Sequence, residues 1–401
     1  MPSSFKQNHL VDRKKTRNRK FNPKTFFLAL VHLIAGRNRE GYGHALTRTW
    51  EDLSLPFVEI PVKSALTQAR GRISFRFFRD IFEEQIEQFE EERPTYKGFH
   101  IYGVDGDQMS LPAASEILEH GYRGYPSPGK KETYFPRMYV THAVDVMSGV
   151  SKAIRYSPHN DEHPFACRLA RSYEKNSITL YDRLHLSAEL IRAHHQAGNH
   201  FVVRCRRGAT FSEVKTFFRS HQRNLVFEMD GIPVRLVKVR NPKTDHDAVF
   251  ATSLPVGFLR NREIRQLYGY RWTCETTFRD FTSTLKAEQW HAKTLNGILQ
   301  EFYAALWLMN FAKIEIFRRT KPQKDFMCVT YKKPNFKLIV DFLRDHFAQA
   351  LIHVSRAFES RLDFLIQRTM EQRKHLQRSY PRQLREASTR YPLNSLVKRR
   401  A

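Results

Sequence analysis

Cysteine is scarce in this 401-residue chain, and no two cysteines form a Cys-x-x-Cys pair. The four are Cys167, Cys205, Cys274 and Cys328. Such scattered cysteines argue against a disulfide framework or a structural zinc site, and they indicate a reducing cytoplasm. Long hydrophobic runs are also missing, because no stretch approaches eighteen apolar residues and no apolar signal segment follows the basic N-terminus. We therefore expect a soluble protein that stays in the compartment where it is made.

Acidic residues are few relative to basic ones. The chain has 41 Asp and Glu against 67 Lys and Arg, which gives a net charge of +26. This excess attracts polyanions and favours nucleic-acid binding through counterion release. No basic amphipathic helix with a Trp/Leu face is present, so a membrane surface is the less favoured partner. A hydrophobic content of 41% with 31 Phe is sufficient for a folded core at this length.

The N-terminal part reads as helical and basic. Residues 1–24 are polar and rich in Lys and Arg, which predicts an arm, and the pattern is helical to about Glu92. A short helix and turn after Pro61 indicate a unit of the helix-turn-helix kind. The side chains expected on its exposed face are Lys63, Gln68, Arg70 and Arg72. We predict that residues 1–92 comprise a basic arm and a helical DNA-binding domain.

The middle of the chain alternates between strands and helices. From 99 to 205 the pattern predicts a strand, a hairpin turning at Met147-Ser148-Gly149, a helix, a strand, a helix and a strand. That order is typical of an α/β protein with a mixed sheet and helices on its faces. Residues 206–258 add further strands, which we interpret as an inserted β subdomain. Long helices are predicted next, and the region 321–401 is basic and helical.

Two acidic residues directly follow buried strands. Asp105 comes after Ile-Tyr-Gly-Val, with Gly106 expected to form a tight turn, and Asp182 comes after Ser-Ile-Thr-Leu-Tyr. Carboxylates fixed at strand ends provide the hard oxygen ligands that Mg²⁺ prefers, and two ions about 3.5–4 Å apart support phosphodiester chemistry. An acid after a strand is also common as a helix cap or turn residue. Neither residue identifies a site by itself.

The predicted helix over 261–287 carries one polar stripe. Offsets of three or four residues bring its members within about 80° of one another on a helix. They are Tyr268, Arg271, Glu275, Arg279, Thr282 and Lys286. A carboxylate for a metal, flanked by Arg and Tyr for phosphates, suits a nucleic-acid site. The alternative is an exposed face with ordinary Arg–Glu pairs.

The run Tyr268-x2-Arg271-x3-Glu275 resembles the Tyr-Arg-Glu-Lys signature of bacterial insertion-sequence DDE transposases of family four. VDGDQMSLP and SITLYDRLHLSAELI are similar to the segments that carry the first and second aspartates of that family. The likeness extends from roughly 61 to 312. It implies an RNase H-like catalytic domain over 93–320, with the β insertion between the second and third acids.

The resemblance also implies the chemistry. Asp105, Asp182 and Glu275 would bind two Mg²⁺ ions, with Mn²⁺ as a substitute, for DNA cleavage and strand transfer. Tyr268 and Arg271 would contact DNA phosphates. The partners would be the element's terminal repeats and target DNA, bound by a homodimer in the bacterial cytoplasm at the nucleoid.

Two positions depart from the family pattern. The signature lysine is Thr282, so Arg279 and Lys286 are the cations expected to supply its charge. The first motif reads Asp-Gly-Asp, so Asp107 competes with Asp105, which we prefer because it ends the apolar strand. A catalytically silent DNA-binding relative and a nuclease of the same fold remain alternatives.

Other motifs favour structural interpretations. His159 and His163 have the spacing of zinc ligands on a helix but no third ligand, so a loop with a helix cap is preferred. His194-His195 is expected on an exposed helix face, and Trp290 either stacks on a base or packs in the protein. The loop Ser127–Lys131 reads as a solvated turn.

Overall fold

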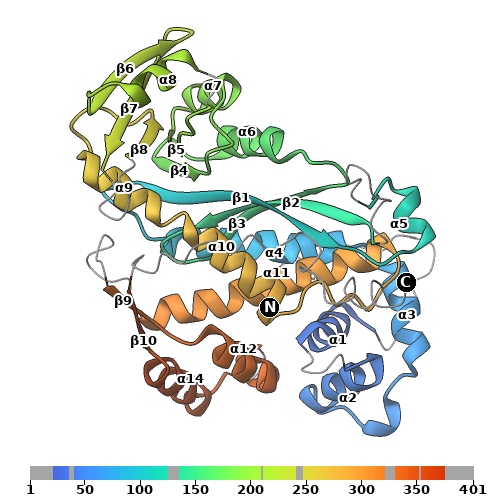
Figure 1. Cartoon of the computed structure of the whole chain (residues 1–401). Helices are drawn as coiled ribbons and strands as arrows, with labels where there is room; N and C mark the ends of the chain where they lie inside the picture. Colours follow the sequence, from blue (N-terminus) through green and yellow to red (C-terminus); the bar gives the residue numbers. More distant parts are fainter. Residues whose placement is uncertain are drawn as a thin grey trace, which may run out of the picture.

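A computed structural model describes residues 21–35, 40–124, 135–208, 211–240, 247–320, 330–351 and 354–374. Most of the predicted N-terminal arm, the loop Ser127–Lys131 and the last 27 residues, 375–401, lie outside these ranges. The molecule is built on a central sheet that runs between two layers of helices (Figure 1). Within the described residues, no helix combines the length and apolar character needed to cross a bilayer.

The central sheet has eight strands in the order β3-β2-β1-β4-β5-β8-β7-β6. Their bounds are β1 His100–Ser110, β2 Arg137–Asp145, β3 Ser151–Ser157, β4 Ser177–Tyr181, β5 His200–Arg204, β6 Asn224–Met229, β7 Ile232–Val239 and β8 Ala248–Thr252. The first three strands are antiparallel, whereas β4 and β5 run parallel to β1. This mixed order is that of the RNase H-like fold, as predicted.

The strands between the second and third predicted acids extend this sheet. β8 pairs with β5 and β7 pairs with β8, so β6–β8 continue the central sheet instead of forming a separate one. The predicted β insertion is therefore present as an added edge of the main sheet. A helix that was not predicted, α8 (Ser212–Arg219), precedes these strands and packs Val214 and Phe217 into the core.

Helices cover both faces because alternate residues of a strand face opposite sides. Tyr102 and Val104 of β1 are buried with residues of α6 (Glu162–Ser172), α7 (Ala188–Ala197) and α8. Ile101 directly precedes Tyr102, so its side chain faces the opposite side of the sheet, where it packs with Leu267 of α9 (Asn261–Gly269). A short helix, α5 (Ser115–Glu119), follows β1.

The N-terminal helices share a core with α11 (Leu295–Thr320), the long helix beneath the sheet. They are α1 Pro23–Ala35, α2 Tyr42–Asp52, η2 Phe57–Glu59, α3 Lys63–Arg72, α4 Arg76–Phe89 and η3 Glu90–Glu92. Phe27 of α1 contacts Trp307 of α11 edge to face, with ring centroids 4.9 Å apart. The hydrophobic cluster that contains α1 and α4 also includes Met109 of β1, so one core joins these helices to the sheet.

The predicted DNA-binding face of α3 is wrong at Arg70, which is not exposed. Its side chain is buried, with one guanidinium nitrogen 2.7 Å from the Glu301 carboxylate and 2.7 Å from the Gly297 carbonyl oxygen. The hydroxyl of Tyr42 accepts a further hydrogen bond at 2.8 Å. Arg70 therefore ties α3 to α11, whereas Lys63 and Gln68 are exposed as expected.

The single helix predicted over 261–287 is broken into three parts. α9 ends at Gly269, α10 spans Trp272–Arg279, and a π-helical turn, η4, spans Asp280–Thr284. Glycine has a low helix propensity. The backbone N–H groups of Tyr270 and Arg271 donate to carbonyl oxygens three residues earlier, as in a 3₁₀ turn, so the chain is wound more tightly at this point. Apolar side chains of all three parts are nevertheless buried, among them Leu267, Cys274, Phe278 and Phe281.

The C-terminal region forms a smaller layer against α11. It contains α12 Phe336–Asp345, α13 Phe347–Leu351 and α14 Arg356–Arg368, together with the paired strands β9 Thr330–Lys333 and β10 Glu371–Lys374. The helices agree with the predicted helical character, whereas the strand pair was not predicted. Ile339 and Leu362 join the main core of the molecule.

Candidate active site

Asp105 and Asp182 come from neighbouring parallel strands. Gly103 of β1 pairs with Leu180 of β4, and the same register two residues further along brings the two aspartates side by side. β1 continues to Ser110, so Asp105 lies within the strand instead of ending it as predicted. Asp182 directly follows β4, in agreement with the sequence pattern.

α10 delivers Glu275 to these aspartates through a close approach at Gly103. A Cβ atom added at Gly103 would be 2.3 Å from the Cys274 Sγ and 3.9 Å from the Arg271 Cα. Only a residue without a side chain permits this contact between helix and strand. The small residue in β1 thus positions both Arg271 and Glu275 beside Asp105.

Arg271 bridges two of the three acids. One guanidinium nitrogen donates to the Asp105 carboxylate at 3.0 Å, and another donates to the Glu275 carboxylate at 2.6 Å. The Arg271 side chain is 10% exposed. Burial opposes its charge, but Tyr268, Asp105 and Glu275 together raise the pKa of Arg271, so the guanidinium stays protonated. A fixed positive charge therefore lies between the first and third acids.

His185 holds the second acid. Its Nδ1 is 2.9 Å from the Asp182 carboxylate, which also accepts a hydrogen bond from the Leu184 backbone N–H at 2.7 Å. On the other side, His185 Nε2 lies 3.3 Å from Glu162, an ion-pair separation without hydrogen-bond alignment. Burial lowers the pKa of His185, but the two carboxylates outweigh it and raise the value to about 9. The imidazolium links Asp182 to Glu162.

Glu162, at the start of α6, is a fourth acid that sequence reasoning did not assign. Its carboxylate lies against Gly106, where an added Cβ would be 2.3 Å from the Glu162 Cδ. Gly106 therefore serves a close approach within β1 and does not form the turn predicted from sequence. The glycine directly after Asp105 indicates a close contact at this position. The sequence did not reveal which residue makes the contact, because Glu162 is far from Gly106 in the chain.

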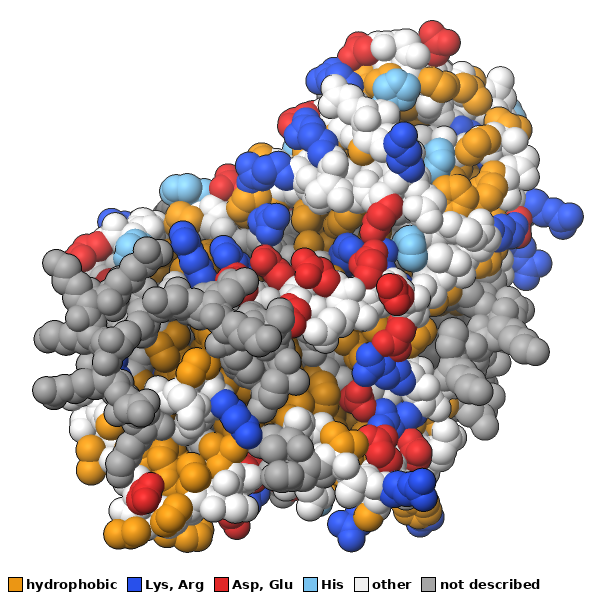
Figure 2. Space-filling view, turned by 180° about the vertical axis from the view of Figure 1, so that it is seen from behind, with side chains coloured by type: hydrophobic (Ala, Val, Ile, Leu, Met, Phe, Trp, Pro, Cys, Tyr) orange, Lys and Arg blue, Asp and Glu red, His pale blue; other side chains and the backbone are white. Residues whose placement is uncertain are grey.

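The acids repel one another. Burial is the main cause that raises the pKa of Asp105 to about 6; Arg271 opposes it, and the carboxylates of Glu162, Glu275 and Asp182 raise it further. A divalent cation among these hard oxygen donors would relieve the repulsion, so the residues fit a Mg²⁺ or Mn²⁺ site. Acidic side chains are also visible across the middle of one face, with Lys and Arg around them (Figure 2).

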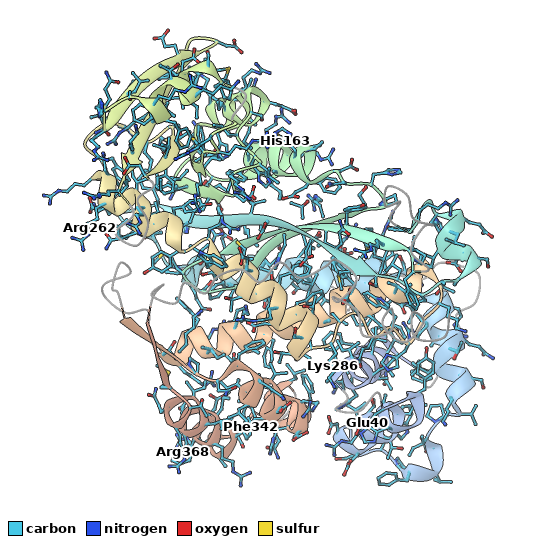
Figure 3. The ribbon with its side chains drawn as sticks, viewed as in Figure 1. Glu40, His163, Arg262, Lys286, Phe342 and Arg368 are labelled. Atoms are coloured by element: carbon cyan, nitrogen blue, oxygen red, sulfur yellow. The ribbon has the colours of Figure 1, made fainter. Side chains whose placement is uncertain are left out.

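A cavity of about 290 Å³ adjoins this cluster. Its polar lining comes from Asp105, Asp107, His142, Glu275, Arg279 and Thr282. The predicted stripe is thus only partly preserved, since Lys286 lines a different cavity, beside Glu301, and lies at the far end of the broken helix from Arg262 (Figure 3). Tyr268 packs on Phe250 with ring centroids 5.0 Å apart.

Two of the remaining motifs have structural roles in the described residues. His194 is fully buried, with its ring nitrogens 3.0 Å from the Tyr181 hydroxyl and 2.5 Å from the Asn199 side chain, so its expected exposure was wrong. His195 is exposed as predicted. The Trp290 indole N–H donates to the Ser110 carbonyl at 2.7 Å, which favours the packing role.

The fold and the origin of these acids indicate the class of protein. The family model described as "Transposase DDE domain" matches residues 99–311, more than half of the chain, and the chain belongs to this family. The matched segment starts just before β1 and ends within α11, so it contains Asp105, Asp182 and Glu275.

Particular relatives come from Escherichia coli (strain K12). Transposase InsG for insertion sequence element IS4 is 22% identical over 297 residues, covering 68% of this chain and 64% of InsG. Putative transposase InsZ is 26% identical over 140 residues, covering 34% of this chain and 46% of InsZ. The chain thus spans less than two thirds of the length of either relative.

Among solved structures, a piggyBac transposase synaptic complex with hairpin DNA aligns over 90% of this chain and 80% of that one. Its TM-score is 0.47 at 12% identity.

Proposed function

We propose that this protein is a DNA transposase that binds the ends of an insertion sequence and catalyses metal-dependent DNA cleavage and strand transfer. The observation that carries the proposal is the convergence of three acids from separate elements, within the segment matched by the DDE family. The net charge of +26 supports a polyanionic substrate. The DNA partners are the terminal repeats and the target, and synapsis of two ends requires at least a homodimer.

Asp105, Asp182 and Glu275 are the proposed ligands of two Mg²⁺ ions, for which Mn²⁺ can substitute. When bound, such ions activate the attacking oxygen and stabilise the leaving oxygen of the phosphodiester. Asp105 is preferred to Asp107 because it contacts Arg271 and its pKa responds to the other acids, whereas Asp107 is exposed. Within the protein, His185 orients the Asp182 carboxylate through its 2.9 Å contact.

The basic residues have different proposed roles. Arg271 offsets the repulsion between the Asp105 and Glu275 carboxylates through its contacts with both. We propose that Arg271 and Tyr268 also contact a DNA phosphate. Arg279 is exposed and lines the cavity of Glu275, so it is the better substitute for the signature lysine. Lys286 would contact DNA outside that cavity.

The proposal is tested on a supercoiled plasmid that carries the DNA flanking both ends of the coding region. With Mg²⁺, the wild-type protein should nick the element ends and join a pre-cut end to target DNA. Asp182→Ala and Glu275→Ala should each slow both reactions by about 10²–10³-fold, on the order expected for lost electrostatic stabilisation of the transition state, while retaining DNA affinity. Glu228→Ala, an exposed acid on β6, is the matched control.

The alternatives give different results in this assay. A catalytically silent relative, which the Thr282 substitution favours, would bind the ends without cleaving them. A nuclease would cleave without forming strand-transfer products. Either result would contradict the transposase proposal.

A further inference from the structure

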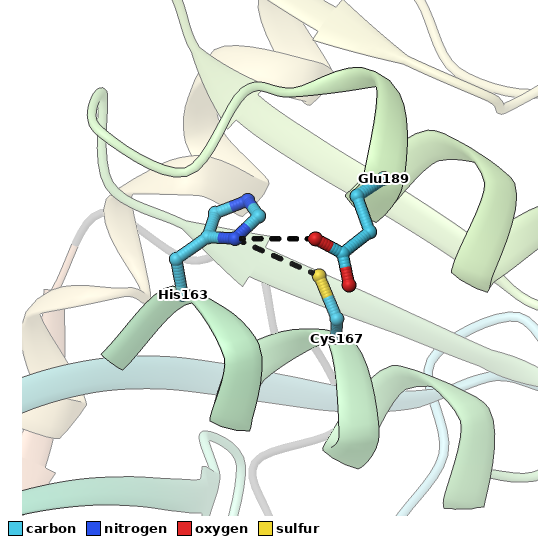
Figure 4. A group of neighbouring side chains, drawn as sticks. All are labelled: His163, Cys167 and Glu189. Atoms are coloured by element: carbon cyan, nitrogen blue, oxygen red, sulfur yellow. Dashed lines mark hydrogen bonds and ion pairs between the residues drawn. The ribbon is translucent and has the colours of Figure 1, made fainter. Parts of the chain in front are cut away.

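Three side chains with different ligand chemistries meet on α6 and α7, outside the cluster of acids (Figure 4). His163 and Cys167 are one helical turn apart on α6, and Glu189 is in the first turn of α7. The His163 Nδ1 is 3.9 Å from the Cys167 Sγ and 3.9 Å from a Glu189 carboxylate oxygen. Within the described part of the chain, no other three His, Cys, Asp or Glu side chains bring their ligand atoms within 4.8 Å of one another.

We propose that His163, Cys167 and Glu189 bind one Zn²⁺ ion. An imidazole, a thiolate and a carboxylate around one point form a donor set that zinc accepts, whereas a thiolate is a poor ligand for Mg²⁺. Zinc bonds of about 2.0–2.3 Å in tetrahedral geometry imply ligand separations of about 3.3–3.6 Å. The observed 3.9 Å separations need only small side-chain movements to reach that range. Water would complete the coordination.

The surroundings of His163 prepare it for this role. Its Nε2 is 2.6 Å from the hydroxyl oxygen of Ser187, which also accepts the Leu190 backbone N–H at 3.1 Å as the N-cap of α7. A hydroxyl oxygen has two lone pairs and can accept both hydrogen bonds. With the proton on Nε2, the lone pair of Nδ1 faces Cys167 and Glu189. Outer hydrogen bonds of this kind fix the tautomer of a metal-binding histidine.

The other two ligands are also compatible with a metal. The second carboxylate oxygen of Glu189 lies 3.8 Å from Arg171, which leaves the oxygen nearest His163 available. Cys167 is buried and would lose its thiol proton to solvent as the Zn–S bond forms, so binding releases one proton. This site was not predicted from the sequence because the expected signal was a pair of cysteines, and only one of the three proposed ligands is a cysteine.

A bound ion would join α6 to α7. Glu162 directly precedes His163, and the loop with Asp182 and His185 runs straight into Ser187 and α7. The zinc site would therefore fix the two helices that hold the Glu162–His185–Asp182 chain of contacts. Its role is structural and does not require the ion to touch DNA.

Co²⁺ is the probe for this site, used on the full chain after removal of metals. We expect one equivalent to produce a thiolate-to-cobalt charge-transfer band in the near ultraviolet and to be displaced by Zn²⁺. Cys167→Ser should abolish the band, whereas Cys205→Ser, a buried cysteine outside the cluster, should retain it. Asp182→Ala should also retain the band, which separates this site from the proposed catalytic metals.

A second variant guards against misfolding of Cys167→Ser. Glu189 is exposed, so Glu189→Gln should preserve the fold and weaken Zn²⁺ binding by about tenfold or more. Zn²⁺ should raise the melting temperature of the wild type and raise that of Glu189→Gln less. The absence of a charge-transfer band in folded wild-type protein, or its persistence in Cys167→Ser, would overturn the proposal.

Discussion

Gly103 of β1 lies so close to Cys274 of α10 that an added Cβ would be 2.3 Å from the Cys274 Sγ. The helix can approach the strand at this point because neither residue projects a large side chain. The same approach carries Arg271 and Glu275 to Asp105. Packing at one glycine thus sets the position of Arg271 and Glu275 relative to Asp105, which is 166 residues away from Arg271 in the sequence.

Gly103→Ala should destabilise the protein by about 1–3 kcal/mol, because the new methyl group overpacks a core contact. It should also reduce DNA cleavage, since α10 must move away from β1. Chemical denaturation monitored by circular dichroism measures the stability, and the plasmid assay measures the activity. Gly71→Ala is the control: nothing lies within 4 Å of its added Cβ, and the helical position should tolerate Ala or gain stability.

A compensating change tests the cause. Cys274→Ala removes the sulfur atom that the new methyl group would meet, so Gly103→Ala with Cys274→Ala should be less destabilised than the sum of the single changes. Strictly additive losses would show that the contact between these two residues is not what requires glycine.

Arg70→Ala should lower the free energy of unfolding far more than substitutions of exposed residues on α3. Arg70 and Glu301 are 5% and 4% exposed, and removing one partner leaves a buried carboxylate without its counter-charge. We expect a loss of about 3–5 kcal/mol in the free energy of unfolding. Lys63→Ala and Gln68→Ala, at exposed positions, should change it by about 0.5 kcal/mol or less. Equal effects at all three positions would contradict a structural role for Arg70.

These cases show what the sequence could and could not predict. Short apolar runs predicted β1 and β4, and the turn at Met147-Ser148-Gly149 predicted the β2–β3 hairpin. Gly198 ends α7 in the left-handed conformation that glycine adopts readily. Such features depend on neighbours in the chain, so local patterns reveal them. The three acids were proposed as a set only with the family resemblance, because a position near a strand end or on a polar helical stripe does not by itself identify a site.

Long-range contacts could not be predicted in the same way. The burial of Arg70 depends on Glu301, and the role of Gly106 depends on Glu162. A periodic pattern also assumes an unbroken helix, so it missed the tightening after Gly269 and the π-helical turn η4, which lies between Glu275 and Lys286. Each error arises where tertiary packing overrides a local preference.

Arg271→Ala should make the protein more responsive to divalent metal. Without the guanidinium, the carboxylates of Asp105 and Glu275 repel each other. We expect the free energy of unfolding to fall by about 1–2 kcal/mol, less than for a fully buried ion pair because both carboxylates are partly exposed. Mg²⁺ should therefore raise the melting temperature of this variant by more than it raises that of the wild type.

Arg271→Lys is the informative comparison. A lysine restores the charge, but its compact ammonium lacks the fork that reaches two carboxylates at once. Its metal response should lie between those of the wild type and Arg271→Ala. An identical rise in melting temperature for all three proteins would show that Arg271 does not neutralise the acids.

His185 should make the metal-free protein lose stability at alkaline pH. The Asp182 and Glu162 carboxylates raise the pKa of His185 to about 9, above an unfolded value of about 6.5. Because the folded pKa is the higher one, this contribution is fully present below pH 6.5 and is lost as pH rises through about 9. A difference of that size corresponds to at most about 3 kcal/mol, by linkage.

The measurement is the free energy of unfolding between pH 6 and pH 9.5 in the presence of EDTA. The wild type should become less stable across this range, whereas His185→Gln should start less stable and show a flatter dependence. His195→Gln, at an exposed position on α7, should keep the wild-type slope. If His185→Gln retains that slope as well, the imidazolium between Asp182 and Glu162 does not contribute to stability, and another group must hold Asp182 in place.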